Sequence, residues 1–294
     1  MGGIAWIGAG KMGLPICRRL KDARQDVCVL ARTPERAAVL EAFGLATASS
    51  VPTLINGAQI IFTCVTDDMA LADVILGGDF VAAAPKGAIL VDMSTVSPAI
   101  SAQVARHLPA GMSYLRSPVS GSTAMAAAGA LTALVSGPEA AFNDMADVFS
   151  TFTKKAFHLG RGEEARVLKL AINSMVAATA ALLGEALALG LKGGLSNEVM
   201  LEVITHSAVA SPLIGYKKDM IIEGDYAPAA TLNMLMKDVD LFLGAARGMK
   251  LELPLNRMIL GIYEQAAARG LGEKDFFVLE KEAAARLPLP RRMA

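Results

Sequence analysis

Short apolar runs alternate with helical patterns along the chain up to about residue 160. Each run has the length of a buried strand, and the segment after it carries apolar residues at helical spacing. This alternation is typical of a doubly wound, mostly parallel sheet, whose ligands lie at the carboxyl ends of the strands. The sequence therefore predicts an α/β domain over residues 1–161. We expect its strands near residues 4–7, 26–32, 59–65, 88–94, 112–115, 131–136 and 155–159.

From Gly162 onward the strand patterns stop and helical periodicity takes over. Successive segments there have apolar residues at helical spacing, with no strand pattern between them. We therefore expect an all-α domain over residues 162–294. Its helices are predicted at residues 165–191, 196–208, 211–221, 231–249, 253–270 and 275–285.

The first of these helices, over residues 165–191, is long, apolar and rich in alanine and glycine. This composition suits a central helix that is packed on all sides, within the chain or against a second subunit. A membrane span needs about 20 apolar residues in a row. Polar residues interrupt the helix before that length is reached, so we expect no membrane partner. They are Lys169, Asn173, Ser174 and Glu185.

The composition is that of a globular protein, with 53% hydrophobic and 19% charged residues among 294. The formal net charge is zero and no long run of like charges occurs, which argues against nucleic acid as a partner. Cys17, Cys28 and Cys64 lie in apolar patterns without ligand spacing, so we interpret them as reduced core thiols. The chain reaches its first strand without a signal-type segment, and we expect a cytoplasmic protein.

Three glycines at GxGxxG spacing follow the first strand and lead into a helical segment, as in a Rossmann domain. The first permits a tight turn, the second lets the backbone approach a phosphate, and the third lets the helix pack on the strand. Free N–H groups at the helix start can then bind phosphates. A dinucleotide site is predicted, with a purely structural turn as the alternative. The predicted loop residues are Gly8, Ala9, Gly10, Lys11, Met12 and Gly13.

The residue that distinguishes NAD from NADP follows the second strand in such domains. NAD-binding domains usually carry Asp or Glu there for the ribose 2′-hydroxyl, whereas this chain has Arg32 followed by Thr33. A guanidinium and a hydroxyl suit a 2′-phosphate, so we predict a preference for NADP(H), with NAD(H) as the other candidate. Two alternatives stay open. In the first, Arg32 is only a solvated residue at a helix start. In the second, Arg36, one turn further on, contacts the 2′-phosphate in its place.

Polar residues also follow the third and fourth predicted strands, where a parallel sheet gathers its ligands. Val65, Thr66 and Asp67 come after the third strand and are candidates for cofactor contact. Ser94 and Thr95 come after the fourth, where a hydroxyl can reach a substrate carboxylate or the cofactor ribose. The alternative for these residues is a simple turn.

Ser120, Gly121 and Ser122 follow a later short strand and open a helix of small residues. Their N–H groups and hydroxyls form a nest suited to a small carboxylate, and we predict that they bind the substrate. Lys169 and Asn173 are four residues apart on a predicted helix and therefore share one face. A lysine among apolar neighbours either extends to solvent or faces a functional cleft, and the spacing alone slightly favours the first.

Five motifs in order make the chain resemble the β-hydroxyacid dehydrogenase family over nearly its whole length. They are the glycine loop with Met12 and Pro15, DMSTVSP from Asp92, SPVSGSTAMAAAGALTALVSG from Ser117, GRGEEARVLKLAIN from Gly160 and MKDVDL from Met236. The resemblance implies hydride transfer between a nicotinamide cofactor and a small β-hydroxyacid or semialdehyde carboxylate. It makes Lys169 the catalytic residue that gives or takes a proton at the substrate oxygen, with Asn173 as its orienting partner.

The same resemblance implies further roles and an assembly. Lys237 would contact the cofactor, with Asp238 nearby, and a charge pair on a solvated helix face is the alternative. A homodimer or homotetramer is implied by the family's pairing through its helical domains. No metal is needed for this chemistry, and the three histidines are scattered without ligand spacing. They are His107, His158 and His206.

The chain departs from the family pattern at a few positions. Ser122 stands where a second glycine is usual, and Ser174 where a second asparagine is usual. Arg116 and Ser117 replace the usual acidic residue and alanine. Two other functions are weighed against the dehydrogenase: an imine or ketone reductase of the same architecture, and a non-catalytic scaffold. The retained Lys169 argues against both, while the substrate and the direction of turnover do not follow from the sequence.

Overall fold

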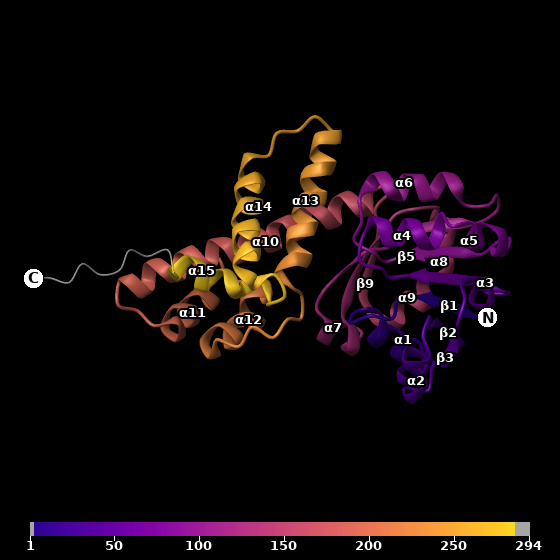
Figure 1. Cartoon of the computed structure of the whole chain (residues 1–294), viewed down its shortest axis with the longest axis horizontal. Coiled ribbons are helices and arrows are strands. Elements are labelled where there is room, and N and C mark those ends of the chain that lie inside the picture. The colour runs from indigo at the N-terminus through magenta and orange to yellow at the C-terminus, as the bar shows by residue number, and fades with distance from the viewer. Residues whose placement is uncertain (1–2, 286–294) are drawn as a thin grey trace, which may run out of the picture. The chain divides into compact units, whose positions relative to one another are not determined.

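The structure is a computed structural model, which describes residues 3–285. The chain forms two compact units, Met1–Lys169 and Leu170–Ala294, and each is described by itself (Figure 1). The helix α10 (Glu164–Lys192) begins in the first unit and continues in the second.

A six-stranded parallel sheet in the order β3-β2-β1-β4-β5-β6 forms the centre of the first unit (Figure 1). The winding reverses between β1 and β4, and this switch point places ligands beyond the carboxyl ends of these two strands. The prediction of a doubly wound parallel sheet is confirmed. The strands are β1 (Ile4–Ile7), β2 (Val27–Leu30), β3 (Ala46–Ala48), β4 (Ile60–Thr63), β5 (Ile89–Asp92) and β6 (Ser113–Arg116).

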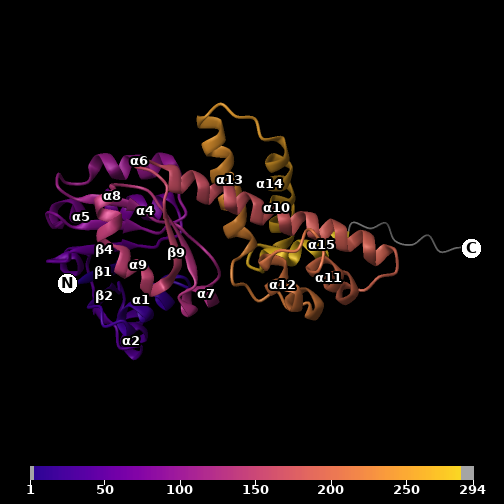
Figure 2. The same ribbon diagram turned by 180° about the vertical axis from the view of Figure 1, so that it is seen from behind.

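Helices cover both faces of this sheet (Figures 1 and 2). Side chains of α1, α2 and α9 are buried on one face, and those of α3, α4, α5 and α6 on the other. Side-chain caps fix several of the helix starts, because they accept hydrogen bonds from otherwise unpaired N–H groups. The helices are α1 (Gly13–Asp22), α2 (Pro34–Ala42), α3 (Val51–Ile55), α4 (Asp68–Ile75), α5 (Gly78–Ala83), α6 (Pro98–His107) and α9 (Ala146–Phe152).

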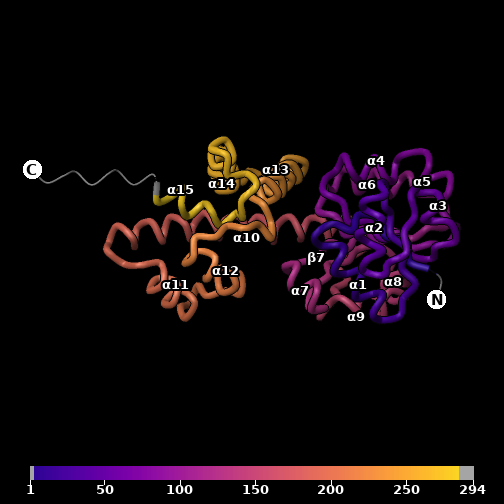
Figure 3. Tube along the Cα trace, turned by 60° about the horizontal axis from the view of Figure 1, so that its bottom comes forward, coloured from indigo at the N-terminus to yellow at the C-terminus, as the bar shows by residue number. Residues whose placement is uncertain are grey.

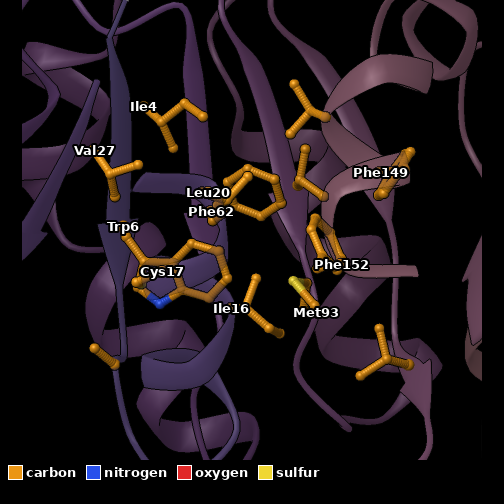
Figure 4. Packing of buried hydrophobic residues seen from close by; sticks show 14 of the residues in the cluster. Ile4, Trp6, Ile16, Cys17, Leu20, Val27, Phe62, Met93, Phe149 and Phe152 are labelled. Atoms are coloured by element: carbon orange, nitrogen blue, oxygen red, sulfur yellow. The ribbon is translucent and has the colours of Figure 1, made fainter. Parts of the chain in front are cut away.

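Alternate residues of β1 are buried in two separate cores, one on each face of the sheet. On one face Trp6 stacks on Phe62, with ring centroids 4.8 Å apart, and Phe62 meets Phe152 edge-on at 6.2 Å (Figure 4). Ala5 and Ile7 lie in the core of the opposite face. Burial on both faces explains why these strands are continuous apolar runs rather than alternating ones.

The last strands of the first unit form a separate sheet in the order β7-β8-β9, in which β7 is antiparallel to β8. The sequence pattern predicted strands in this region but not their separation from the main sheet. Arg116 at the end of β6 and Ser136 after β8 exchange two backbone hydrogen bonds of 2.9 Å, an isolated antiparallel bridge that links the two sheets. The strands are β7 (Val119–Ser120), β8 (Leu131–Val135) and β9 (Thr153–His158).

Short elements account for the other differences from the prediction. The strand β3 and the helices α3 and α5 were not predicted, because three to six residues carry too little periodicity. The segment between β8 and β9 forms two helices, α8 (Glu139–Asp144) and α9, which meet at Met145. A further short helix, α7 (Thr123–Ala128), lies at the expected place.

The second unit is mostly helical, as predicted (Figure 3). Helices α13 and α14 lie on one side of α10, and α11 and α12 on the other (Figures 1 and 3). The helix predicted over residues 253–270 changes to a π-helical turn at Ala267–Leu271, where Gly270 has a φ of 84°. The segment predicted over 275–285 begins as a 3-10 turn. The elements are α11 (Asn197–Thr205), α12 (Pro212–Glu223), α13 (Leu232–Gly248), α14 (Pro254–Ala266), a 3-10 helix (Phe276–Val278) and α15 (Leu279–Ala285).

The helix α10 buries one apolar face and exposes another. Its Ala177 and Ala180 lie in the core of the second unit, whereas Met175, Leu182 and Leu189 are 69%, 69% and 76% exposed. These three residues repeat every seven positions and form one line along the helix, called the α10 stripe below. By length and composition alone α10 could cross a membrane, a test that the core helix of a globular protein also passes. The prediction of a helix packed on all sides is therefore not met within one chain.

Candidate active site

The glycine loop between β1 and α1 has the shape of a phosphate site. Gly8 has a φ of 95°, and a Cβ there would overlap the backbone carbonyl of Cys64. A Cβ on Gly13 would overlap the Gly8 carbonyl, so this glycine lets α1 pack against the strand end. Gly10 is exposed, and a Cβ there would meet nothing within 4 Å. The outer side of the loop is therefore open to a ligand.

A groove of about 720 Å³ borders this loop. A smaller hollow of about 480 Å³ adjoins it and shares Leu30, Arg32, Asp73 and Val74 with it. Together they extend from the glycine loop past the end of β2, as a dinucleotide does in this fold. The residues present therefore fit a nicotinamide dinucleotide. Of the predicted cofactor residues, the groove is lined by Gly8, Ala9, Gly10, Lys11, Arg32, Thr33 and Val65.

The two candidate arginines at the 2′-phosphate position have different surroundings. The Arg36 guanidinium donates to the backbone carbonyl of Ala9 and thus holds the glycine loop. Arg32 is exposed and borders both hollows. Thr33 caps α2, since its hydroxyl accepts the Arg36 N–H at 3.3 Å. This division favours Arg32 as the residue available to a 2′-phosphate.

The segment after β4 meets the groove through Val65. Asp67 caps α4, because its carboxylate accepts the Ala70 N–H at 2.9 Å, and it also accepts the Thr66 hydroxyl at 2.8 Å. Thr66 and Asp67 thus have a local structural task beside the predicted cofactor contact.

The segment after β5 is held by buried hydrogen bonds. The Ser94 hydroxyl accepts the Val65 N–H at 3.0 Å, and the Ser94 N–H donates to Asp92 at 3.0 Å. The other Asp92 contacts include the Thr63 hydroxyl at 2.8 Å. Ser94 is only 2% exposed, while Thr95 is half-buried. Ser94 therefore joins the segments that follow β4 and β5, whatever else it contacts.

Arg166, in the first turn of α10, forms the centre of a buried cluster that no sequence pattern indicated. Its guanidinium pairs with Asp92 and donates to the Ser94 carbonyl at 2.5 Å, the Tyr114 hydroxyl at 3.1 Å and the Ser101 hydroxyl at 3.3 Å. The Arg166 and Asp92 side chains are 1% and 0% exposed. We call these five residues the Arg166 network.

The Arg166 network keeps Arg166 charged and the Tyr114 hydroxyl protonated. Burial is the largest influence and opposes the charged form of Arg166, but Asp92, Tyr114 and Glu163 together outweigh it, so the pKa of Arg166 is raised. Burial and the same carboxylate raise the pKa of Tyr114 to about 12, and its hydroxyl stays protonated as a donor. A guanidinium with four acceptors, one of them a carboxylate, satisfies the conditions under which a buried charge is tolerated.

The predicted carboxylate nest lies at the end of β7. Gly121 has a φ of 136°, and a Cβ there would lie 2.7 Å from the Leu131 side chain. Ser122 caps α7 through the Met125 N–H at 3.3 Å, and Ser120 pairs with β8. The glycine conformation is therefore required at Gly121, whereas the departure at Ser122 serves as a helix cap.

The departure at Arg116 is compensated within the first unit. Its guanidinium donates to Glu163 from Nε at 3.0 Å and from Nη2 at 2.6 Å, and it lies over the Tyr114 ring. Arg116 is 7% exposed. Arg116 and Glu163 thus form a pair in which a later segment of the chain supplies the acidic group.

Lys169 and Asn173 are one turn apart on the continuous helix α10, as predicted. In the second unit Asn173 donates to the Asp238 carboxylate at 2.6 Å. The other Asp238 oxygen is paired with Lys237 at 2.9 Å. Asp238 is 6% exposed, so it is a buried link between α10 and α13 rather than a residue on a solvated helix face.

Within residues 3–285 no group of three or more His, Cys, Asp and Glu side chains could hold a metal ion. Burial raises the pKa of the Cys17 thiol, and burial with the Asp92 carboxylate raises the pKa of Cys64 to about 12. Cys17 is buried, as expected of a core cysteine, whereas Cys28 and Cys64 are half-buried and pack against the two cores.

Comparison with known protein families agrees with the fold and the groove. Residues 3–160 match the model described as the NAD binding domain of 6-phosphogluconate dehydrogenase. Residues 163–281 match the model described as NAD-binding of NADP-dependent 3-hydroxyisobutyrate dehydrogenase. The chain is thus an oxidoreductase that uses a nicotinamide cofactor.

Individual relatives show to which family of oxidoreductases the chain belongs. The chain is 32% identical over 281 residues to 2-(hydroxymethyl)glutarate dehydrogenase of Eubacterium barkeri, covering 95% of this chain and 93% of that protein. It is 32% identical over 280 residues to L-threonate dehydrogenase of Cupriavidus necator, with 92% and 93% covered. The structure of Mycobacterium tuberculosis 3-hydroxyisobutyrate dehydrogenase with L-serine is similar at a TM-score of 0.85 and 26% identity, with 96% and 99% covered. The chain belongs to the β-hydroxyacid dehydrogenase family.

Proposed function

We propose that the protein transfers a hydride between NADP(H) and a small β-hydroxyacid or semialdehyde carboxylate, in the cytoplasm. The observation that carries the proposal is Lys169 one turn ahead of Asn173 on α10, in a chain whose glycine loop and groove fit the cofactor. The curated relatives described above are named as dehydrogenases of small carboxylates, which supports this substrate class.

Lys169 acts as the general acid and base. In reduction its ammonium gives a proton to the carbonyl oxygen, and in oxidation its amine takes the proton from the alcohol. The cofactor, when bound, supplies or accepts the hydride. Asn173, which is held by Asp238, orients the substrate or the ammonium.

The other predicted residues bind and orient. The glycine loop binds the phosphates through its N–H groups and the start of α1. Ser120, Gly121 and Ser122 bind the substrate carboxylate, together with Ser94 and Thr95. Thr95 also contacts the cofactor, together with Val65, Thr66 and Asp67, and Lys237 adds a cationic contact to it.

A panel assay tests the proposed function. Small β-hydroxyacids and semialdehyde carboxylates are offered with NADP(H) and NAD(H), beside cyclic imines and uncharged ketones. We expect turnover of carboxylate substrates. Turnover of imines or ketones alone would favour the reductase alternative, and binding of the cofactor without any turnover would favour a scaffold.

Arg32→Asp should shift the cofactor preference towards NAD(H). Loss of a charge-assisted contact to the 2′-phosphate is expected to weaken NADP(H) binding at least about tenfold. Arg36→Gln is the matched control, because Arg36 holds the loop and its loss should weaken both cofactors alike. Titration of each variant with both cofactors measures this. Equal affinity of the wild-type protein for the two cofactors, or tighter NAD(H) binding, contradicts the assignment.

The exposed α10 stripe supports a homodimer or homotetramer. A second copy would cover Met175, Leu182 and Leu189, which otherwise present a line of apolar side chains to water. We expect sedimentation to give an even multiple of the 30.6 kDa chain. Leu182→Glu should shift it to the monomer, whereas Val39→Glu, on the exposed face of α2, should not. A monomeric wild-type protein at micromolar concentration contradicts the proposal.

A further inference from the structure

The Arg166 network joins several elements that carry predicted site residues. Its five members come from β5, the segment after β5, α6, β6 and the first turn of α10. Arg166 lies three residues before Lys169 on the same helix, and its Nη1 donates to the Ser94 carbonyl at 2.5 Å. The network therefore links the start of the lysine-bearing helix to the segment with Ser94 and Thr95.

We propose that Arg166 is a positioning residue, which fixes the first turn of α10 so that Lys169 is aligned for proton transfer. This inference rests on the proposed function, since it concerns the acid and base role of Lys169.

The geometry of the guanidinium carries the inference. A planar fork bound on several sides by acceptors in fixed directions restricts both the rotation of the helix and its shift along its axis. The carboxylate of Asp92 is itself fixed by the Thr63 hydroxyl at 2.8 Å and the Ser94 N–H at 3.0 Å. Rotation of a helix moves every side chain on it, and a shift of about 1 Å at a reacting group can lower a rate by about 10²-fold.

Removing both charges of the Asp92–Arg166 pair together tests whether the role of this pair is purely structural. In Asp92→Asn combined with Arg166→Met, the amide oxygen of the introduced side chain can still accept from Thr63 and Ser94, and no charge is left buried. Loss of both members of a buried pair is often tolerated by the fold. We expect a folded protein whose kcat is at least about tenfold lower per cofactor-binding site, with cofactor affinity within about threefold of wild type.

Isotope effects separate positioning from stability. With NADPH deuterated at the transferred C4 position, a misaligned Lys169 slows the step in which hydride and proton are transferred together, so this step limits turnover more and the primary isotope effect on kcat rises. A merely structural role changes the folded fraction but leaves the isotope effect and the KM of the folded molecules unchanged. The matched control is Asp275→Asn combined with Lys217→Met, which removes the buried 2.5 Å ion pair of the second unit. This control variant should leave the isotope effect and the KM at wild-type values.

Arg166→Lys gives a second route if the double variant does not fold. It keeps the charge beside Asp92 but loses the fork, so we expect kcat at least about threefold lower with a raised isotope effect. Wild-type kcat and isotope effect in the folded double variant, or in Arg166→Lys, overturn the inference. If Lys169→Ala itself keeps wild-type turnover, the proposed mechanism fails and the inference falls with it. If Lys169→Ala is inactive and the Arg166 variants are fully active, only the inference is overturned.

Discussion

Lys169→Ala is expected to abolish turnover while cofactor binding stays nearly unchanged. Loss of a general acid typically lowers a rate by about 10² to 10⁴, and by more when the ammonium also stabilises a developing alkoxide. The glycine loop and groove that fit the cofactor are formed by other residues, so their affinity should persist. Single-turnover hydride transfer on an active substrate, together with cofactor titration of the same variant, measures both quantities.

Two further variants define the lysine's role. Lys169→Arg should not restore the rate, because a guanidinium keeps its proton too tightly and has a different shape from an ammonium. Lys192→Ala, on an exposed position in the last turn of the same helix, should behave as wild type. Turnover of Lys169→Ala within about threefold of wild type would show that Lys169 only extends to solvent, since loss of a general acid costs far more. The imine reductase and scaffold alternatives would then move ahead.

Arg166→Met alone is expected to lower the free energy of unfolding by about 3 to 5 kcal/mol. The substitution leaves the Asp92 carboxylate buried without its cation, which is the costly way to break an internal ion pair. Several acceptors lose their donor as well, since the guanidinium also bridges Ser94, Ser101 and Tyr114. Equilibrium unfolding in urea, followed by circular dichroism, gives the loss as a lower midpoint.

Two control variants test the loss of unfolding free energy that we expect for Arg166→Met. Arg161→Met, at an exposed position shortly before α10, should change the unfolding free energy by no more than about 0.5 kcal/mol. Adding Asp92→Asn to Arg166→Met should recover much of the lost stability, because the unpaired charge is removed. A single Arg166→Met variant within about 1 kcal/mol of wild type is incompatible with a buried pair of this kind.

The main sheet and the glycine loop could be predicted because their signals are local. The GxGxxG spacing directly after an apolar strand is itself diagnostic, although the backbone that a Cβ on Gly8 would overlap is that of Cys64, after β4. The strands β1, β4 and β5 are apolar runs, apart from Thr63 and Asp92 at the ends of β4 and β5, because both faces are covered. The separate small sheet could not be predicted, since its strand pairing, with β7 antiparallel and β9 parallel to β8, leaves no local signal in the sequence.

The Arg166 network could not be predicted because its partners are far apart along the chain. Arg166 lies 74 residues from Asp92 and 52 from Tyr114. In the sequence it is an arginine in the first turn of a helix, where such residues are usually solvated. Arg116 was recognised only as a departure from a family pattern, and its partner Glu163 became visible only in three dimensions. Long-range polar contacts leave no periodic signal in one sequence.

The edge strands of the two sheets are protected against pairing with other chains, which limits aggregation. Unpaired edge strands are templates for other chains, and proteins protect them with short strands, charges or local coverage. Here β3, at one edge of the main sheet, is three residues long, and the end of β6 at the other edge is occupied by Ser136. The edge strand β9 of the small sheet carries the exposed Lys154 and Lys155. Growth of either sheet into a fibril is thus disfavoured at each of these strands.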